Sequence, residues 1–471
     1  MDVDALLLAR IQFAFTVTFH IIFPSFTIGL AAFVATLLVR WRATGEERFH
    51  RLARFWTKVF AVSFAMGVVS GIVLSYQFGT NWARFSVVAG NVVGPLLGYE
   101  VLTAFFLEAT FLGIMLFGWQ RVSPNLHVLS AILVAIGTSL SAFWILSANS
   151  WMQTPAGHEM RDGIAYPVSW AEIIFNPSFP YRFAHMFTAA FLTTSLVVLS
   201  VGARYLVKNR FVEESKTMIR MGLGMVAILA PLQLLIGDAH GLNTAEHQPA
   251  KLAAMEAHWE SDKPAALVLF AWPDAKAESN HFELSIPRIA SLIITHDLNG
   301  LFKGLKDFKA EDRPPILPVF FAFRLMVGLG LIMIAIGFIG AYLWWRRKLF
   351  ETAWYLRSLT YAWPLGFVAI VAGWWVTETG RQPYIISGML RTVDAASPVA
   401  FSAVLTTLIL FVLVYSSVFS MGILYINKLI EKGPVGMAVA PEADADESAG
   451  ARPLAAAREA ARSALESKEE Q

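Results

Sequence analysis

The feature that most constrains this sequence is a series of long segments that contain no Asp, Glu, Lys or Arg residue. Each is long enough to cross, or nearly cross, an apolar layer of about 30 Å as a helix. The seven segments are residues 11–39, 59–82, 122–157, 183–203, 221–237, 358–377 and 395–427. Residues 85–119 and 316–345 join them if Glu100, Glu108 and Arg324 are accepted within a span. Backbone groups in lipid must be paired within their own segment, so the sequence predicts an all-α integral membrane protein with nine transmembrane helices.

The amino-acid composition agrees with lipid as the surrounding solvent. Hydrophobic residues make up 56% of the 471 residues and charged residues only 15%, whereas soluble domains average about 45–50% and about 25%. The formal net charge of +2, with Lys and Arg spread among loops, excludes a nucleic-acid-binding surface. The absence of cysteine excludes disulfides, iron–sulfur clusters and thiolate-ligated or covalently attached c-type heme.

The connections that follow the odd-numbered spans are basic, as Arg346, Arg347 and Lys348 after the seventh span illustrate. The positive-inside rule assigns such connections to the cytoplasm. The N-terminus is therefore predicted outside and the C-terminus in the cytoplasm. The acidic first residues lack the basic start of a cleaved signal sequence, so the first span is expected to be retained.

The chain divides into four segments on this pattern. Residues 1–237 carry spans one to six, and residues 315–432 carry spans seven to nine. Between them, residues 238–314 form an outward loop that holds much of the charge and is long enough to carry function. Residues 433–471, rich in Ala, Glu, Arg and Ser, have no apolar face adequate for a core and are expected to be a disordered cytoplasmic tail.

Four potential metal ligands lie in the predicted spans, toward the outer side: His20, His185, Met326 and Glu378. His and Met are axial ligands of heme iron, and without cysteine a noncovalent heme is the natural metal cofactor. The residues alone leave two other interpretations open. A histidine inside a membrane also serves as a hydrogen-bonded helix contact, and buried glutamates fit the proton or ion relay of a transporter.

Taken together, the strings around these residues resemble subunit I of the cytochrome bd quinol oxidases over about residues 5–427. The outward loop is similar to the short version of that family's quinol-binding loop, and RTVDAASP at residues 391–398 is similar to the cyanide-insensitive branch. The matching strings are FHIIFP around His20, YQFGTNW at 76–82, GYEVLTAFFLEATFLG around Glu100 and Glu108, LSAFWILSANSWMQTP at 140–155, FAHM at His185, KLAAMEAHWE at 251–260, FRLMVGLG at Met326 and GWWVTETGRQP around Glu378.

The resemblance implies three hemes. His185 and Met326 would be the axial ligands of a low-spin heme b, a six-coordinate arrangement that suits electron transfer. His20 and Glu378 would each ligate one of two high-spin hemes, one a heme b and the other a heme d or a further heme b. The family pattern also assigns Glu100 to the oxygen-reactive heme, Trp374 to a position between hemes, and three arginines to the heme propionates. Those arginines are Arg324, Arg381 and Arg391.

Proton and quinol sites are implied in the same way. Lys58, Glu108 and Ser141 match a path for cytoplasmic protons, and on a regular helix Glu108 lies about 12 Å along and about 80° around from Glu100. In the outward loop, Glu256 would accept a proton from quinol and Lys251 would hydrogen-bond the quinone oxygen. Charged residues on an amphipathic surface helix would look the same without a substrate.

The resemblance thus implies the heme-bearing subunit of a terminal respiratory oxidase in a bacterial cytoplasmic (inner) membrane. Such a subunit would oxidise ubiquinol or menaquinol, reduce oxygen to water, and generate proton motive force without pumping. A subunit II and a small single-span accessory subunit are the expected protein partners. The alternatives are a proton- or ion-coupled transporter and a di-heme electron carrier without oxygen chemistry.

Overall fold

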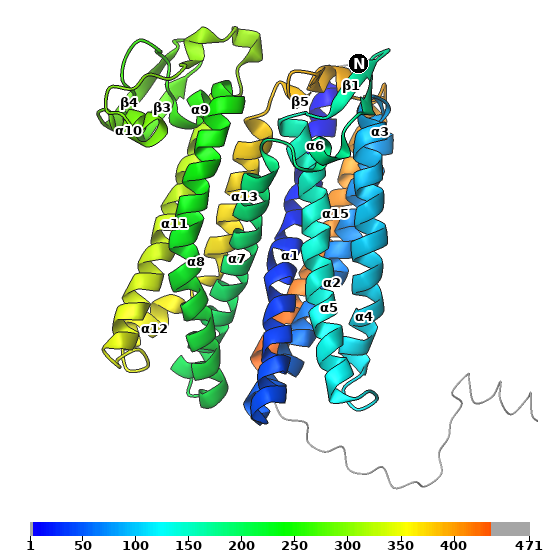
Figure 1. Cartoon of the computed structure of the whole chain (residues 1–471), viewed down its shortest axis with the longest axis vertical. Helices are drawn as coiled ribbons and strands as arrows, with labels where there is room; N and C mark the ends of the chain where they lie inside the picture. The colour runs from blue at the N-terminus through cyan, green and yellow to red at the C-terminus, as the bar shows by residue number, and fades with distance from the viewer. Residues whose placement is uncertain (1–2, 435–471) are drawn as a thin grey trace, which may run out of the picture. The chain divides into compact units, whose positions relative to one another are not determined.

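Long apolar helices dominate the structure, a computed structural model that describes residues 3–434 (Figure 1). Within this range, eight helical spans are long and apolar enough to cross a membrane, and a bent helix pair supplies the ninth. The predicted all-α membrane fold is therefore confirmed. The eight spans are α1 (Val3–Thr44), α2 (Glu47–Thr80), α3 (Ala83–Glu100) continued by α4 (Phe106–Phe117), α5 (Pro124–Gln153), α7 (Phe179–Val207), α8 (Val212–His247), α11 (Ile316–Trp345) and α15 (Phe401–Lys432).

The bent span, eighth in chain order, is broken near the end opposite the long loop (Figure 1). It consists of α12 (Ala353–Leu359) and α13 (Trp363–Thr379), whose axes differ by 43°. Pro364 stands in the first turn of α13, where its missing N–H is tolerated, and its ring prevents α12 from continuing as one regular helix. The predicted tail, residues 433–471, lies outside the described range apart from Gly433 and Pro434, and its disorder stays a prediction.

A π-helical segment, Val101–Phe105, joins α3 to α4 and lies between Glu100 and Glu108. Each residue of a regular α-helix turns the chain by about 100° around the helix axis, so the eight residues from Glu100 to Glu108 would turn it by about 800°. A π-bulge inserts one residue that adds almost no rotation, which reduces the total to about 700°. The two carboxylates then lie within about 20° of one helix face. The expected separation of about 80° is wrong because it assumed regular α-helix throughout.

The spans form two bundles of four. In the first, α1 packs against α2 and α5, and the α3–α4 span closes the ring by contacting both α2 and α5. In the second, α8 and α13 each pack against both α7 and α11, which leaves α7 and α11 diagonally opposite. Close approach of α7 and α8 depends on Gly222, since a Cβ there would come within 2.8 Å of the Ser195 carbonyl oxygen. Contacts of α1 and α5 with α7 join the bundles, and α15 packs outside on α1 and α2.

Short elements cap the bundles at the end that carries the long loop (Figure 1). The loop contains helix α9 (Pro249–Glu256), a hairpin of β3 (Leu267–Asp274) and β4 (Ser279–Ile286), helix α10 (Ile289–Thr295) and two single turns, Leu305–Asp307 and Ala310–Asp312. Helix α8 extends to His247, so the first ten residues assigned to the loop are still helical. The remaining short elements are β1 (His158–Arg161), β2 (Ile164–Pro167), α6 (Trp170–Ile174), β5 (Tyr384–Ile386), β6 (Leu390–Arg391) and α14 (Thr392–Ala395).

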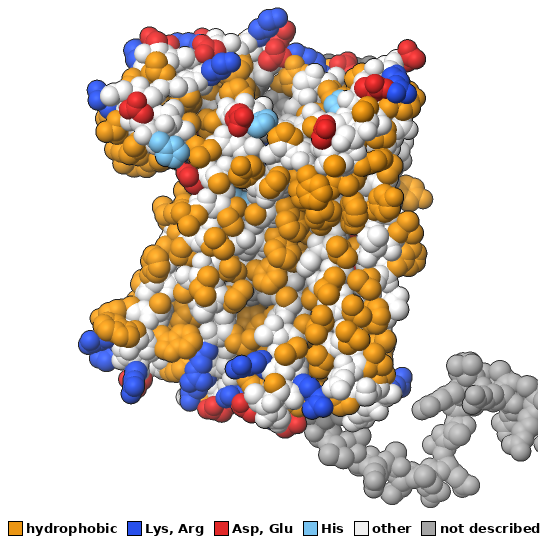
Figure 2. All heavy atoms as spheres, viewed as in Figure 1, with side chains coloured by type: hydrophobic (Ala, Val, Ile, Leu, Met, Phe, Trp, Pro, Cys, Tyr) orange, Lys and Arg blue, Asp and Glu red, His pale blue; other side chains and the backbone are white. Residues whose placement is uncertain are grey.

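The surface agrees with a membrane environment. Figure 2 shows a broad band of hydrophobic side chains between two ends that carry the charged residues. This is the distribution expected when the helices cross a bilayer and their ends lie in water. Which end faces the cytoplasm stays a prediction from the positions of the basic residues.

Candidate functional site

His185 and Met326 lie on the diagonally opposite helices of the second bundle, α7 and α11. The His185 Nδ1 atom is buried and has no hydrogen-bond partner among the described residues, which is a costly state for a ring nitrogen. Glycines face both side chains. A Cβ at Gly237 would lie 3.2 Å from His185 Cε1, and a Cβ at Gly373 would lie 3.0 Å from Met326 Sδ. Glycine at these two positions therefore lets each side chain lie close against the backbone of a neighbouring helix, α8 for His185 and α13 for Met326.

His20 lies in the first bundle and is oriented by α2. Its Nδ1 is 3.1 Å from the Ser70 Oγ. The Ser70 hydroxyl is also 3.0 and 2.9 Å from the backbone carbonyl oxygens of Met66 and Gly67. When the hydroxyl donates to one of these carbonyls, the imidazole Nδ1–H donates to Ser70. That tautomer leaves a lone pair on Nε2, which is the form of histidine that binds iron. Gly71 on α2 lies close to the same ring, because a Cβ at this position would be only 3.2 Å from His20 Cε1.

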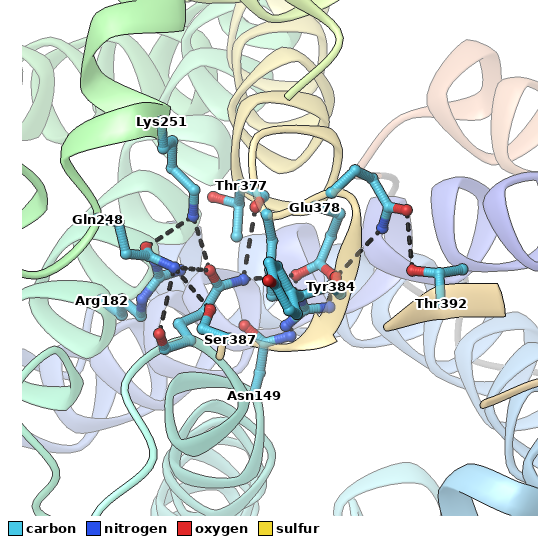
Figure 3. A network of polar contacts seen from close by, with 12 residues as sticks. Asn149, Arg182, Gln248, Lys251, Thr377, Glu378, Tyr384, Ser387 and Thr392 are labelled. Atoms are coloured by element: carbon cyan, nitrogen blue, oxygen red, sulfur yellow. Dashed lines mark hydrogen bonds and ion pairs between the residues drawn. The ribbon is translucent and has the colours of Figure 1, made fainter. Parts of the chain in front are cut away.

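Glu378, in the last turn of α13, is held by a polar network at the end of the bundles that carries the long loop (Figure 3). Its Oε1 accepts hydrogen bonds from Asn149 Nδ2 at 3.1 Å and Gln153 Nε2 at 3.3 Å, both on α5. Its Oε2 forms an ion pair with Arg381. Three directed donors fix the carboxylate at the point where α5 and α13 meet.

The same network buries more positive than negative charge. Arg182 and Arg381 are 7% and 6% exposed, and Glu378 is the one carboxylate that the described residues of the network bond. The Nε of Arg182 and the Nε and one terminal nitrogen of Arg381 have no partner among the described residues. Buried N–H donors without acceptors are costly, so the cluster fits an added anionic group.

Arg182 is the site residue that the sequence analysis missed. It stands three residues before His185 on α7 and so shares a helix face with it. The one hydrogen bond that its side chain makes to another described residue, Gln248 Oε1, is long at 3.5 Å. The signal in the sequence was an arginine one turn from a potential heme ligand, at the start of a span.

Lys251 is buried in the network and does not lie on an open surface. Its Nζ donates to Gln153 Oε1 at 2.6 Å and to Gln248 Oε1 at 2.7 Å. Gln153 therefore connects Lys251, on the loop helix α9, with Glu378 on α13. Burial, together with the nearby guanidinium groups of Arg182 and Arg381, lowers the pKa of the Lys251 ammonium well below its ordinary value. The surroundings thus favour the neutral amine.

Glu256 and Arg324 form a buried ion pair, with Glu256 Oε2 2.8 Å from an Arg324 terminal nitrogen. Arg324 Nε also donates to the Val268 carbonyl oxygen in β3 at 2.5 Å. Because Arg324 is two residues before Met326, this pair ties the loop to the helix that carries a proposed heme ligand. Arg324 and Arg391 each have a carboxylate partner within the chain, Glu256 and Asp312.

Glu100 and Glu108 both face α5. Ser141 Oγ donates to Glu100 Oε1 at 2.7 Å, and Glu108 packs against Gly137, where a Cβ would lie 2.6 Å from its Cγ. Gly137 and Ser141 are one helical turn apart, so the carboxylates follow one another along the same stripe of α5. Glu108 is 5% exposed, whereas Lys58, on α2, is exposed. The structure thus places two of the three residues expected in a proton path, Glu108 and Ser141, along one stripe with Glu100, and leaves Lys58 apart on the surface of α2.

The fold and these residues define a multi-pass membrane protein whose helices carry buried histidine, methionine and carboxylate side chains. The model of the cytochrome bd terminal oxidase subunit I family matches residues 8–434. The chain belongs to that family of heme proteins.

Relatives match over nearly their full lengths. The cytochrome bd-II ubiquinol oxidase subunit 1 of Escherichia coli is 32% identical over 92% of this chain and 98% of its own length. The cytochrome bd ubiquinol oxidase subunit 1 of Bacillus subtilis is 36% identical over 91% and 94%. The solved structure of the bd oxidase from Geobacillus thermodenitrificans superimposes with a TM-score of 0.84 at 31% identity, covering 91% of this chain and 99% of that one.

Proposed function

We propose that this chain is the heme-bearing subunit of a terminal oxidase that oxidises membrane quinol and reduces oxygen to water. The observation that carries the proposal is the pair of His185 and Met326, on diagonal helices and with the His185 Nδ1 atom buried and unpartnered among the described residues, in a chain of the cytochrome bd subunit I family. A transporter has no use for such a pair. An electron carrier without oxygen chemistry does not explain Glu378, because a carboxylate is a poor ligand for low-spin heme.

The heme assignments are those that the family pattern implies, and the ligand chemistry of each residue agrees with them. His185 and Met326 hold a low-spin heme b, and His20 and Glu378 each hold one of two high-spin hemes, a heme b and a heme d or further heme b. The hemes supply electron transfer and the oxygen-binding iron, and the protein orients and tunes them. Trp374, one turn before Glu378 on α13, would then be part of the electron route between hemes, and Glu100 would serve the oxygen-reactive heme.

Arginines bind the heme propionates. Arg381 and Arg182 are the best supported, because both are buried with guanidinium nitrogens that lack acceptors. Arg324 and Arg391 also bind propionates. Each of these arginines already pairs with a carboxylate, Glu256 and Asp312 respectively, so a propionate would be its second anionic partner.

Quinol is oxidised beside helix α9. Glu256 takes the proton of one quinol hydroxyl, and Lys251 hydrogen-bonds a quinone oxygen. The low pKa of Lys251 suits this role, because a neutral amine can also accept a proton. The substrate is ubiquinol or menaquinol, which share the two ring oxygens that these residues would contact.

Protons for water formation come from the cytoplasm, while quinol protons leave on the outer side. Lys58 lies at the entrance, and Glu108, Ser141 and Glu100 form the inner part of the path. Opposite-sided release and uptake separate charge across a bacterial inner membrane without a pump. The chain acts with a subunit II and a small single-span accessory subunit. Its membrane part consists of residues 1–237 and 315–432. Its quinol loop consists of residues 238–314.

Purified complex tests the proposal directly. We expect oxygen uptake that depends on added quinol. Two quinol molecules should be oxidised for each O2 molecule consumed, and hydrogen peroxide should not accumulate. Failure of both ubiquinol and menaquinol analogues to support oxygen uptake by heme-loaded complex would contradict the function.

Glu256→Gln is expected to lower quinol oxidation at least tenfold, because the amide keeps the hydrogen bond to Arg324 but cannot take a proton. Heme content and reduction by dithionite should be unchanged. Glu260→Gln, an exposed loop carboxylate paired with Lys306, is the matched control and should retain activity. Parallel loss of heme and activity in the Glu256 variant would instead assign the residue a structural role through Arg324.

Arg182→Gln is expected to lower the midpoint potential of the low-spin heme, because a positive charge near the heme stabilises its reduced form. A tenfold change in the redox equilibrium corresponds to about 59 mV for one electron. Arg204→Gln, at the opposite end of the same helix, should leave the potential unchanged. An unaltered potential in the Arg182 variant, measured by spectroelectrochemical titration, would remove this arginine from the heme site.

A further inference from the structure

The long loop carries an exposed apolar surface that plays no part in the proposed heme, proton and quinol sites. Phe282 is 85% exposed and Leu284 is 61% exposed, both on β4. Leu284 pairs with Phe270 across the hairpin, so their side chains share one face. We call this surface the hairpin patch, and it consists of Phe270, Trp272, Phe282, Leu284, Leu292 and Ile293.

The hairpin patch is continuous with the membrane-spanning surface of α11. The rings of Phe270 and Trp272 lie 6.0 and 5.9 Å from the ring of Phe321, in the second turn of α11. Helix α10, which carries Leu292 and Ile293, packs against β3. In Figure 1 the hairpin and α10 project sideways past α11, and Figure 2 shows hydrophobic side chains on the lower side of this projection. The patch therefore begins where the apolar band of the helices ends.

We propose that the β3–β4 hairpin and α10 lie within the surface of the lipid bilayer, with the hairpin patch in contact with the acyl chains of the leaflet on the loop side. Large exposed apolar patches on proteins mark contact surfaces. This patch combines aromatic and aliphatic residues, as membrane-interface segments do. The charged residues Asp274, Lys276 and Glu278 are gathered at the turn of the hairpin, so one end of it remains in water.

Lipid is favoured as the occupant because the patch continues a surface that lipid already covers. The β3–β4 hairpin is also bonded to α11 directly, because Arg324 Nε on α11 donates to the Val268 carbonyl oxygen in β3. If the proposed quinol site is correct, the embedded hairpin lies next to the leaflet from which quinol must enter. The membrane contact itself does not depend on that function.

The absence of cysteine from the chain allows a direct test with single spin labels. Phe282→Cys and Ile293→Cys place labels in the hairpin patch, and Ala277→Cys places a matched label at the exposed turn of the same hairpin. The holoenzyme is reconstituted into vesicles of phosphatidylethanolamine and phosphatidylglycerol, and the unsubstituted complex gives the labelling background. Power saturation then compares collisions of each label with oxygen, which concentrates in lipid, and with a water-soluble nickel chelate.

The two patch labels are expected to show an oxygen-to-nickel accessibility ratio several-fold higher than the label at position 277. Equal ratios at all three positions would mean that the patch lies in water and would overturn the proposal. Strong immobilisation with shielding from both reagents would also overturn it, because a protein partner would then cover the patch. Quinol-dependent oxygen uptake of the unlabelled vesicles is measured separately, so failure of the proposed function remains distinguishable from failure of the membrane contact.

Discussion

Replacing Met326 with Leu is expected to remove the low-spin heme signal, or convert it to a high-spin signal, and to abolish quinol oxidation. Leu has a similar volume to Met, so the packing cost of the change is small. What is lost is the thioether sulfur, which lies beside Gly373 on α13 and is the proposed sixth ligand to the low-spin heme. Absorption and electron paramagnetic resonance spectra of the purified variant measure the spin state.

Met333→Leu is the matched control for this variant. Met333 lies on the same helix, α11, and is buried in a hydrophobic cluster of aliphatic and aromatic side chains. Its replacement should leave the heme spectrum and the activity as they are. An unchanged low-spin signal in the Met326 variant would exclude the pairing of His185 with Met326.

Glu108→Gln is expected to slow the proton-coupled steps of oxygen reduction by about 100-fold, the order of effect seen when a proton-transferring group is lost. Glu108 is buried, packs against Gly137, and lies on the same stripe of α5 as the Glu100–Ser141 pair. Gln has nearly the same shape and keeps hydrogen bonding, but it cannot carry a proton. Flow-flash kinetics of the fully reduced enzyme separate oxygen binding, which should be normal, from the later steps.

The control for Glu108 is Glu213→Gln, which removes an exposed carboxylate from the first turn of α8. It should show normal kinetics throughout. Normal proton uptake in the Glu108 variant would exclude this residue from the path. Loss of a heme would instead show that the carboxyl is needed to build the cofactor site.

The sequence predicts the spans well because a charge-free segment of sufficient length has few other stable states in lipid. It does not predict the π-helical segment between Glu100 and Glu108, because hydrophobicity carries no information on a shift of the backbone hydrogen-bond pattern. The same limit applies to the bend between α12 and α13, where Pro364 marks a boundary but gives no angle.

The candidate site shows a different limit. His20, His185, Met326 and Glu378 could be singled out because polar or ligating groups inside spans need a partner or a role. The burial of Lys251 and the ion pair of Glu256 with Arg324 depend on contacts between segments far apart in the sequence. Arg182 looked like an ordinary basic residue at a span end, and only its unpartnered, buried Nε distinguishes it.

The most direct test of the central claim is a heme analysis of the purified complex, combining a reduced-minus-oxidised spectrum, pyridine hemochrome quantitation and carbon monoxide binding. The account predicts three hemes for each copy of this chain, one of them low-spin and unreactive with carbon monoxide, and at least one high-spin heme that binds it. A complex without heme would contradict the account in favour of a transporter, and a complex with only low-spin hemes that bind no carbon monoxide would contradict it in favour of an electron carrier.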